Sequence, residues 1–326
     1  MSPHQWPLGS GFDAASTACD VIAGHDLTGR VAVVTGGYSG LGLETVRVLS
    51  AAGAQVVVPA RHVGRARAAT DGLARVEIRP MDLIHPASVD AFAMGVSDDH
   101  PRIDLLINAA GVMATPLARD AAGVESQFAI NHLGHFRLAA RLWPALVRAG
   151  RARVVTYASG GHQIAPVDVS DISFHTRPYD KWVAYGQSKT ANVLFALELD
   201  RRAAPFGPRA FSLHPGTVLG PLARHLSDAE IASFNVHGPD GRVIVDPARD
   251  LKTVQQGAAT GVWCAISPML DGLGGLYCEN CDVARPQAQS AGHPGHGVAP
   301  WAVDPEAARA LWAVSEALCG LAFLTV

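Results

Sequence analysis

A glycine-rich turn between a buried strand and a helix constrains the fold of this chain more than any other feature. Residues 31–34 (VAVV) form a continuous apolar run, which is typical of a parallel strand covered on both faces. The run TGGYSGLG follows at 35–42, and residues 43–52 have helical apolar spacing that ends at Gly53. This order presents helix N-terminal amides to a diphosphate. The sequence therefore predicts a dinucleotide site that includes Gly36, Ser39, Gly40, Leu41 and Gly42.

Strand and helix patterns alternate along most of the chain. Apolar runs of strand length follow at 55–58, 76–80, 103–107, 153–157 and 275–277. Helical patterns lie at 87–96, 123–148, 251–266 and 301–318, the last with Asp304 as its N-cap and Gly320 after its end. This alternation predicts an α/β fold, a single-domain Rossmann-type doubly wound parallel sheet with helices on both faces. We place this domain at 27–280, between an N-terminal extension over 1–26 and a C-terminal tail over 281–326.

Side chains suited to a ligand come just after the predicted strands. These are Arg61, Asp82, Asn108 and Ser159, in addition to the glycine-rich turn. Ligands of doubly wound sheets bind at the carboxyl ends of the strands. The small residues after 103–107 leave room for a ligand, so the predicted cofactor contacts include Ala109 and Gly111. Leu83, next to Asp82, is also a predicted cofactor contact. Asp82 suits the adenine amine, although a role in a turn is an open alternative.

The end of the second strand is where a dinucleotide site reads the adenosine ribose. An acidic side chain at this point suits a free 2′-hydroxyl group, and an Arg suits a 2′-phosphate. No Asp or Glu occurs between Gln55 and Arg67, whereas Arg61 follows the strand directly. The sequence therefore predicts NADP(H) in preference to NAD(H), with Arg61 as the main contact and Ser39 as a second. A solvated Arg that ends the strand is the alternative.

Tyr185 and Lys189 are the pair best suited to proton transfer. Four residues apart on a helix, their side chains share one face. A phenol has an unperturbed pKa of about 10, and a neighbouring ammonium group lowers it. A solvated helix face is the alternative for this pair. Asn131 is either a locally satisfied buried amide in the 123–148 helix or the mark of a distorted turn that holds a water.

Taken together, these motifs resemble those of the short-chain dehydrogenases/reductases of the non-extended type. They occur in the family's order: TGxxxGxG at 35–42, NAAG at 108–111, Asn131, Ser159, YxxxK at 185–189 and PG at 215–216. The segments SGGH at 159–162, AYGQSKTANVLF at 184–195 and LHPG at 213–216 resemble the branch of retinol dehydrogenases and WW-domain oxidoreductase-like proteins.

The resemblance implies a catalytic set of four residues. It implies Tyr185 as general acid for carbonyl reduction or base for alcohol oxidation, and Lys189 as the group that lowers the Tyr185 pKa and binds the nicotinamide ribose. It implies that Ser159 donates a hydrogen bond to the substrate oxygen and that Asn131 positions a water. The cofactor supplies the hydride.

The resemblance also places the nicotinamide end of the cofactor against Pro215, Gly216, Thr217 and Val218. Relatives usually carry Thr or Ser four residues after the motif glycine, where this chain has Gly220. Thr217 is the available substitute for that contact. A second departure is Gly37-Tyr38 in the turn, where relatives more often have Ala-Asn.

The implied function is an NADP-dependent oxidoreductase that transfers hydride between the nicotinamide and a carbonyl or alcohol group. Aromatic residues before Tyr185 and a predicted helical lid at 221–237 favour a bulky, largely apolar small molecule as partner, with simple packing of these segments as the alternative. A second hypothesis is a cofactor-binding scaffold or regulatory protein without significant turnover. The family also implies a homodimer or homotetramer.

Charge and composition disfavour other classes of protein. The 326 residues carry a formal net charge of -3, which gives no basis for binding nucleic acid. No apolar run approaches the ~18 residues of a membrane span, and the N-terminus lacks a secretory pattern. Five cysteines form no disulfide framework, so we expect a cytoplasmic protein.

One rival chemistry lies near the C-terminus. Cys278 and Cys281, followed by His293 and His296, are zinc-ligand types at a spacing close to a finger pattern. The His spacing is tighter than usual, and glycines and a proline surround both histidines. We therefore favour a plain loop and expect no metal.

Overall fold

The computed structural model describes residues 5–287 and 296–324, and one sheet organises this part of the chain. Its strands are β1 (Val31–Thr35), β2 (Gln55–Ala60), β3 (Val76–Pro80), β4 (Leu105–Asn108), β5 (Arg153–Tyr157), β6 (Arg209–His214), β7 (Leu276–Glu279) and β8 (Asp282–Val283). They lie in the order β3-β2-β1-β4-β5-β6-β7-β8, and only the β7–β8 pair is antiparallel. The winding reverses between β1 and β4, which is where a doubly wound sheet opens a ligand crevice.

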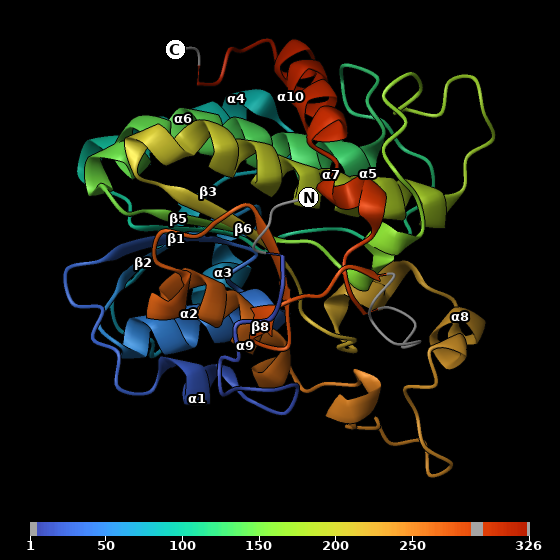
Figure 1. Cartoon of the computed structure of the whole chain (residues 1–326), viewed down its shortest axis with the longest axis horizontal. Coiled ribbons are helices and arrows are strands. Elements are labelled where there is room, and N and C mark those ends of the chain that lie inside the picture. The colour runs from blue at the N-terminus through green and yellow to red at the C-terminus, as the bar shows by residue number, and fades with distance from the viewer. Residues whose placement is uncertain (1–4, 288–295, 325–326) are drawn as a thin grey trace.

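Helices cover both faces of this sheet, as the sequence predicts (Figure 1). One face carries α1 (Ala18–Ile22), α2 (Gly40–Ala51) and α9 (Val254–Ile266). The other carries α4 (Pro86–Asp99), α6 (Gly134–Ala149) and α7 (Lys181–Ala203), with α10 (Pro305–Cys319) lying over α7. The shorter helices are α3 (Val63–Ala69), α5 (Ser126–Phe128) and α8 (Asp228–Ser233). Among the described residues, no helix combines the length and apolarity that a membrane crossing needs.

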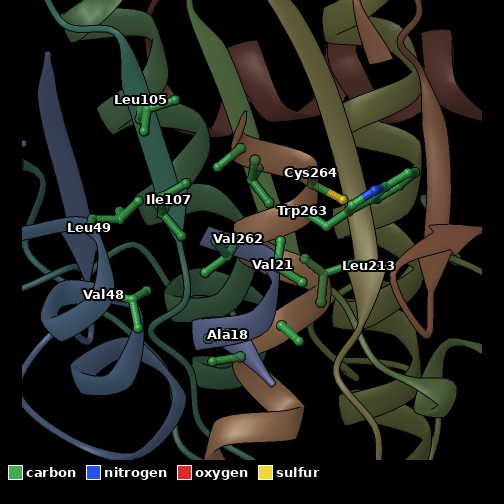
Figure 2. Packing of buried hydrophobic residues seen from close by; sticks show 14 of the residues in the cluster. Ala18, Val21, Val48, Leu49, Leu105, Ile107, Leu213, Val262, Trp263 and Cys264 are labelled. Atoms are coloured by element: carbon green, nitrogen blue, oxygen red, sulfur yellow. The ribbon is translucent and has the colours of Figure 1, made fainter. Parts of the chain in front are cut away.

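Successive residues of the central strands point to opposite faces and so build two cores. Val34 and Ile107 belong to the core under α2 and α9, whereas Val33 and Leu106 belong to the core under α4, α6 and α7. Figure 2 shows the first core from close by, with Ile107 of β4 and Val262 of α9 among the side chains that fill it. Because both faces are covered, consecutive positions of the central strands are apolar, as at 31–34 in β1 and 105–107 in β4, which is the pattern that predicted them.

The segment before Leu27 is fastened to the body of the fold. The Gln5 side chain donates hydrogen bonds to the Tyr277 and Ala284 carbonyls, each at 2.8 Å, and accepts one from the Tyr277 amide at 3.0 Å. Further along, Ala18 and Val21 of α1 are buried in the core beside α9 (Figure 2).

Two predicted helices begin or continue differently in the structure. The helix expected from residue 43 begins three residues earlier, at Gly40, because its first turn is the glycine-rich turn itself. The helix expected over 123–148 begins with α5 at Ser126, passes through a π-helical turn (Ala129–Leu133) and continues as α6. A helical apolar spacing does not reveal either feature, since glycine is a poor helix former and one extra residue in a turn barely disturbs the pattern.

The segment after β6 forms less helix than the predicted lid. It contains a 3₁₀ turn (Pro221–His225) and the two-turn helix α8, and otherwise irregular chain. The two ends of this segment are joined, because the Thr217 amide donates to the Asp250 carbonyl at 2.8 Å and the Lys252 amide donates to the Thr217 carbonyl at 3.0 Å. We call residues 218–249 the lid.

Candidate active site

The glycine-rich turn brings the backbone of β1, β4 and α2 into close approach. Gly36 has a φ of +69°, and a Cβ there would lie 3.0 Å from the Ala110 Cα. A Cβ on Gly42 would collide with the Gly36 carbonyl. Ser39 is the N-cap of α2, so the amides of Gly40, Leu41 and Gly42 are among those that no helical carbonyl can satisfy. This first turn is therefore built to receive an anion.

The end of β4 adds a polar side chain with an unused oxygen. Asn108 is buried, and its Nδ2 lies 3.4 Å from the Thr156 Oγ1, but its Oδ1 has no hydrogen-bond partner among the residues of 5–287 and 296–324. The Thr35 Oγ1 accepts from the amides of Ala109 and Ala110, both at 3.0 Å. These bonds hold the small residues after Asn108 against the turn, as expected of a strand end that leaves room for a ligand.

Asn131 lies in the π-helical turn, so the distorted turn, one of the two alternatives for this residue, is present, and its amide is satisfied by hydrogen bonds as well. Its Oδ1 accepts from the Val112 amide at 2.8 Å, and its Nδ2 donates to the Val112 carbonyl and the Ser188 Oγ, both at 2.9 Å. A Cβ on Gly111 would lie 3.1 Å from the Asn131 Oδ1 and 3.7 Å from the Lys189 Nζ. Asn131, Gly111 and Lys189 are therefore neighbours, although they come from three different elements.

Ser159, Tyr185 and Lys189 meet beyond the end of β5. The Ser159 Oγ accepts from the Gly161 amide at 3.0 Å, and a Cβ on Gly161 would lie 2.7 Å from the Tyr185 Cε1. The Lys189 Nζ donates to the Tyr157 carbonyl at 2.9 Å. Tyr185 and Lys189 are both buried, so the alternative of a solvated helix face is wrong.

The pKa of Tyr185 differs from the sequence expectation. Burial raises it to about 12, and a hydrogen bond with Ser159 opposes this rise. Burial likewise lowers the pKa of Lys189 to about 8. The sequence predicts that the ammonium group lowers the phenol pKa, but in the protein alone the Lys189 hydrogen bond goes to a backbone carbonyl, and burial sets the direction of the Tyr185 shift.

The segment after β6 approaches the glycine-rich turn through α9. Gly257 of α9 is the point of contact, since a Cβ there would lie 2.7 Å from both the Leu41 Cδ2 and the Val218 Cγ2, and 3.4 Å from the Pro215 carbonyl. Gly216 has a φ of +89°, which turns the chain away from the sheet. Pro215, Gly216, Thr217 and Val218 thus lie beside the first turn of α2.

Three predicted contacts lie toward the outer strands. Arg61 is exposed at the end of β2, where its Nε lies 3.3 Å from the His62 Nε2, and it forms no ion pair with the described residues. Asp82 follows β3 and closes a turn: its carboxylate accepts from the Ile84 amide at 3.3 Å, and its amide donates to the Ser88 Oγ at 2.9 Å. The turn role left open for Asp82 is therefore present. Leu83 lies directly against Gly134 of α6.

Several polar residues of the site are not among the site residues predicted from the sequence. His135 is buried in α6, with its Nε2 at 2.9 Å from the Thr35 Oγ1 and its Nδ1 at 3.0 Å from the Asn131 carbonyl. His162 and His214 flank Ser159, and Asp250 pairs with His214 at 2.9 Å. The available signals were a His beside each motif, at 162 in SGGH and at 214 in LHPG. Asp250 had none, because it reaches the site only through the fold of the lid.

The Cys278 and Cys281 pair is part of the core. Both side chains are buried, and burial raises the pKa of Cys281 to about 12, which disfavours the thiolate that zinc requires. The His296 Nδ1 is 3.7 Å from the Glu279 Oε2, and His293 lies outside the described residues. Over the part of the chain that the structure describes, no three His, Cys, Asp or Glu side chains gather in a way that could hold a metal.

The residues present fit a nicotinamide dinucleotide. A cradle that side chains would fill is kept open at Gly36 and Gly42, an anion-binding helix start follows it, and Asn108 keeps a buried acceptor unpaired beside it. Gly36 to Gly42 would hold the diphosphate, Arg61 and Ser39 the adenosine end, and 215–218 the nicotinamide end. The fold and this site together define a dinucleotide-binding protein of the Rossmann class.

Comparison with known proteins identifies the family. The family model described as short chain dehydrogenase matches residues 30–231. A "probable oxidoreductase" of Streptomyces antibioticus is 48% identical over 88% of this chain and 96% of its own length. The chain belongs to the short-chain dehydrogenase family and is an NAD(P)-dependent oxidoreductase.

Relatives at lower identity agree with this assignment. The human WW domain-containing oxidoreductase is 34% identical over 94% of this chain and 72% of its own length. The crystal structure of an uncharacterized protein from Mycobacterium paratuberculosis is 34% identical, with a TM-score of 0.72, and covers 95% of this chain and 99% of that one.

Proposed function

We propose that this protein uses NADPH to reduce the carbonyl group of a bulky, largely apolar small molecule, with Tyr185 as the proton donor. The observation that carries the proposal is the meeting of the half-buried Ser159 with the buried Tyr185 at the carboxyl end of the sheet, beside the candidate cofactor site. When bound, the nicotinamide supplies or accepts the hydride.

The roles of the chain's own residues follow from charge. Reduction of a carbonyl builds negative charge on its oxygen, which must be stabilised and then protonated. The Ser159 Oγ accepts from the Gly161 amide, so its hydroxyl proton, which is donated to Tyr185 in the protein alone, would be donated to the carbonyl oxygen when substrate is bound. Tyr185, with a pKa raised to about 12, keeps its proton at neutral pH and can donate it to the carbonyl oxygen on which negative charge builds. This favours reduction as the direction, with alcohol oxidation as the reverse reaction.

Asn131 and Lys189 have supporting roles in the proposal. The Asn131 amide is fully committed to Val112 and Ser188, so it braces the π-helical turn against α7. Its backbone carbonyl, which accepts from His135, faces the same buried region and is suited to hold a water. Lys189, a buried cation beside Tyr185, would bind the nicotinamide ribose and supply positive charge as the reaction proceeds.

Preference for NADP(H) rests on Arg61. Its guanidinium group is exposed and in no ion pair with the described residues, so it is available to a 2′-phosphate. His62 and Arg65 lie close to it in sequence, and no acidic residue follows β2 before Asp71. A free ribose hydroxyl would find no carboxylate partner in this stretch.

The substrate class rests on the aromatic side chains beside Tyr185. Trp182 lies edge-on to Tyr185, with ring centroids 6.3 Å apart, and contacts Phe234 of the lid at 5.9 Å. The Lys181 Nζ forms an ion pair with Glu230 of α8 at 2.6 Å, and the Trp182 Nε1 donates to the same carboxylate at 3.3 Å. The lid therefore presents an aromatic surface next to the proton donor, which suits an apolar partner.

The test is NADPH oxidation, with NADH in parallel, against a panel of hydrophobic aldehydes, ketones and quinones that includes retinal. We expect turnover with NADPH that increases with the apolar bulk of the carbonyl compound. Tight NADPH binding without turnover on any carbonyl, and without the reverse reaction on alcohols, would instead favour the cofactor-binding scaffold.

Compartment and assembly are part of the same proposal. All five cysteines are free thiols in the structure, which suits a reducing cytoplasm. We propose a homodimer or homotetramer on the family resemblance alone, and sedimentation of the purified protein would measure its mass directly.

A further inference from the structure

Two histidines hold the Ser159–Gly160 peptide group from opposite sides. The His162 Nδ1 lies 2.6 Å from the Ser159 carbonyl oxygen. The Gly160 amide of the same peptide group donates to the His214 Nδ1 at 2.9 Å. Together the two bonds fix the orientation of the peptide group that directly follows the Ser159 side chain.

The second nitrogen of each ring shows which tautomer is present. The His162 Nε2 accepts from the Ala299 amide at 3.1 Å, so its Nδ1 carries the hydrogen and donates to Ser159. The His214 Nδ1 accepts from Gly160, so its Nε2 carries the hydrogen and donates to the Asp250 Oδ2 at 2.9 Å. The two rings are therefore neutral and of opposite tautomer. Burial, which lowers the pKa of His162 to about 4, agrees with a neutral ring.

Asp250 is fixed at the base of the lid. It has a φ of +63°, and its backbone carbonyl accepts from the Thr217 amide at 2.8 Å. Its Oδ1 has no hydrogen-bond partner in the described part of the chain, and the Lys252 Nζ lies 3.9 Å from it. Lys252 is itself held by the Asn280 Oδ1 at 2.5 Å. The Asp250 carboxylate is thus charged and partly buried. The backbone contacts that close the base of the lid orient it toward His214.

We propose that His162 and His214 are positioning residues for Ser159, and that Asp250 fixes the His214 tautomer needed for this task. The inference rests on the proposed role of Ser159 as the donor to the substrate oxygen. If the Ser159–Gly160 peptide group rotates, the Gly161 amide that holds the Ser159 Oγ is displaced, and a displacement of about 1 Å at the reacting groups can cost about 100-fold in rate. The His214–Asp250 pair also joins the lid to the catalytic centre, since the same residues close the base of the lid.

Two substitutions of His214 separate its two bonds. His214→Asn keeps an acceptor close to the place of Nδ1 but loses the donor to Asp250. His214→Gln keeps a donor close to the place of Nε2 but loses the acceptor for Gly160. We expect kcat to fall by about 10- to 100-fold in His214→Gln and by much less in His214→Asn, with the Kd for NADPH unchanged in both.

Thermal stability should rank these variants in the opposite order. His214→Asn leaves the buried Asp250 carboxylate without its partner, which costs more than the loss of one bond to a backbone amide. A purely structural role for His214 would make kcat follow stability, and this outcome would overturn the proposal.

A spectroscopic measurement on the unmodified protein tests the tautomer itself. Histidine labelled with ¹⁵N should show His214 protonated at Nε2 and His162 protonated at Nδ1. Asp250→Asn should populate the other His214 tautomer and lower kcat, whereas Asp246→Asn, whose side chain does not cap the neighbouring turn, should change neither. His214 protonated at Nδ1 in the unmodified protein would refute the inference, and this result needs no variant to fold.

Ser159→Ala separates failure of this inference from failure of the proposed function. If Ser159→Ala leaves kcat unchanged, the proposed function is wrong at Ser159. If Ser159→Ala lowers kcat while His214→Gln retains the rate of the unmodified protein, only the positioning role is wrong.

Discussion

Lys189 and Tyr185 share one face of α7, but the Lys189 Nζ lies 5.7 Å from the centre of the Tyr185 ring and gives its hydrogen bond to the Tyr157 carbonyl. Without cofactor, the ammonium group is therefore buried with a carbonyl oxygen as its partner, and no carboxylate of the residues that the structure describes lies at salt-bridge distance from it. Burial lowers its pKa to about 8. A residue kept in this environment is costly to the fold, which is typical of a functional position.

Replacing Lys189 by Met should stabilise the cofactor-free protein at pH 7. The folded pKa of about 8 lies below the ordinary value of 10.5, so the unfolded chain binds more protons between these pH values. The stability of the unmodified protein therefore rises as pH increases through this range. We expect Lys189→Met to be about 1–3 kcal/mol more stable at pH 7, with the difference lost above about pH 10.

Denaturant unfolding of both proteins at pH 7 and at high pH measures this effect. The Tyr157 carbonyl keeps a donor in the variant, because the Asn192 Nδ2 lies 3.1 Å from it. Lys181→Met, at a partly exposed cation paired with Glu230, is the control and should not gain stability. A destabilised Lys189→Met protein at pH 7 would contradict this account of Lys189.

Gly42→Ala should abolish cofactor binding. The added methyl group would collide with the Gly36 carbonyl, so the glycine-rich turn must open. Gly64→Ala is the matched control, because a Cβ there meets nothing within 4 Å and Gly64 lies in α3. That control should retain binding and gain up to about 1 kcal/mol from helix propensity. Equal NADPH affinity in the two variants, measured by titration calorimetry, would mean that this turn does not hold the cofactor.

Arg61→Asp should weaken NADPH far more than NADH. Loss of a charge-assisted bond to the 2′-phosphate costs about 1.5–3 kcal/mol, or roughly 10- to 100-fold in Kd. Arg67→Asp, which changes the charge equally in the last turn of α3, is the control. Fluorescence titration of both variants with NADPH and with NADH gives four Kd values, each of which is divided by the Kd of the unmodified protein. If Arg61→Asp weakens both cofactors to the same extent, the preference for NADP(H) is not set by this residue.

Phe234→Ala should raise KM for bulky apolar carbonyls and leave small ones unaffected. Phe234 is 41% exposed on the lid and contacts Trp182 beside Tyr185. Phe206→Ala is the control, because Phe206 is 40% exposed but packs on Trp143, away from the lid. Steady-state kinetics on a graded series of aldehydes would decide. A uniform change across the series would show that the lid does not select substrate by size.

Most of the sheet, its order of motifs and the strand ends could be predicted because each depends on local sequence, whereas β6 and β8 were not among the predicted strands. Val34 and Ile107 lie in runs that are apolar on both faces, and such runs have one common explanation in a chain that alternates with helices. The glycine-rich turn follows β1, Asn108 ends β4 and Ser159 comes after β5. The parallel topology alone therefore brings these residues to one edge of the sheet.

What could not be predicted depends on contacts between distant segments. The raised pKa of Tyr185 is a consequence of burial, which a four-residue spacing does not report. The pairing of His214 with Asp250 spans the whole lid, and no periodicity links two residues so placed. The π-helical turn at Asn131 could be suspected from the amide but not distinguished from a satisfied helical residue.

Tyr185→Phe tests the central claim most directly. It removes only the phenolic oxygen of a buried ring, so the cofactor site should be preserved. We predict that NADPH binds with nearly unchanged Kd while carbonyl reduction falls about 100- to 10,000-fold. Tyr179→Phe, which removes another partly buried hydroxyl, should keep its turnover. Substantial residual turnover in Tyr185→Phe with NADPH bound would contradict the assignment of Tyr185 as proton donor.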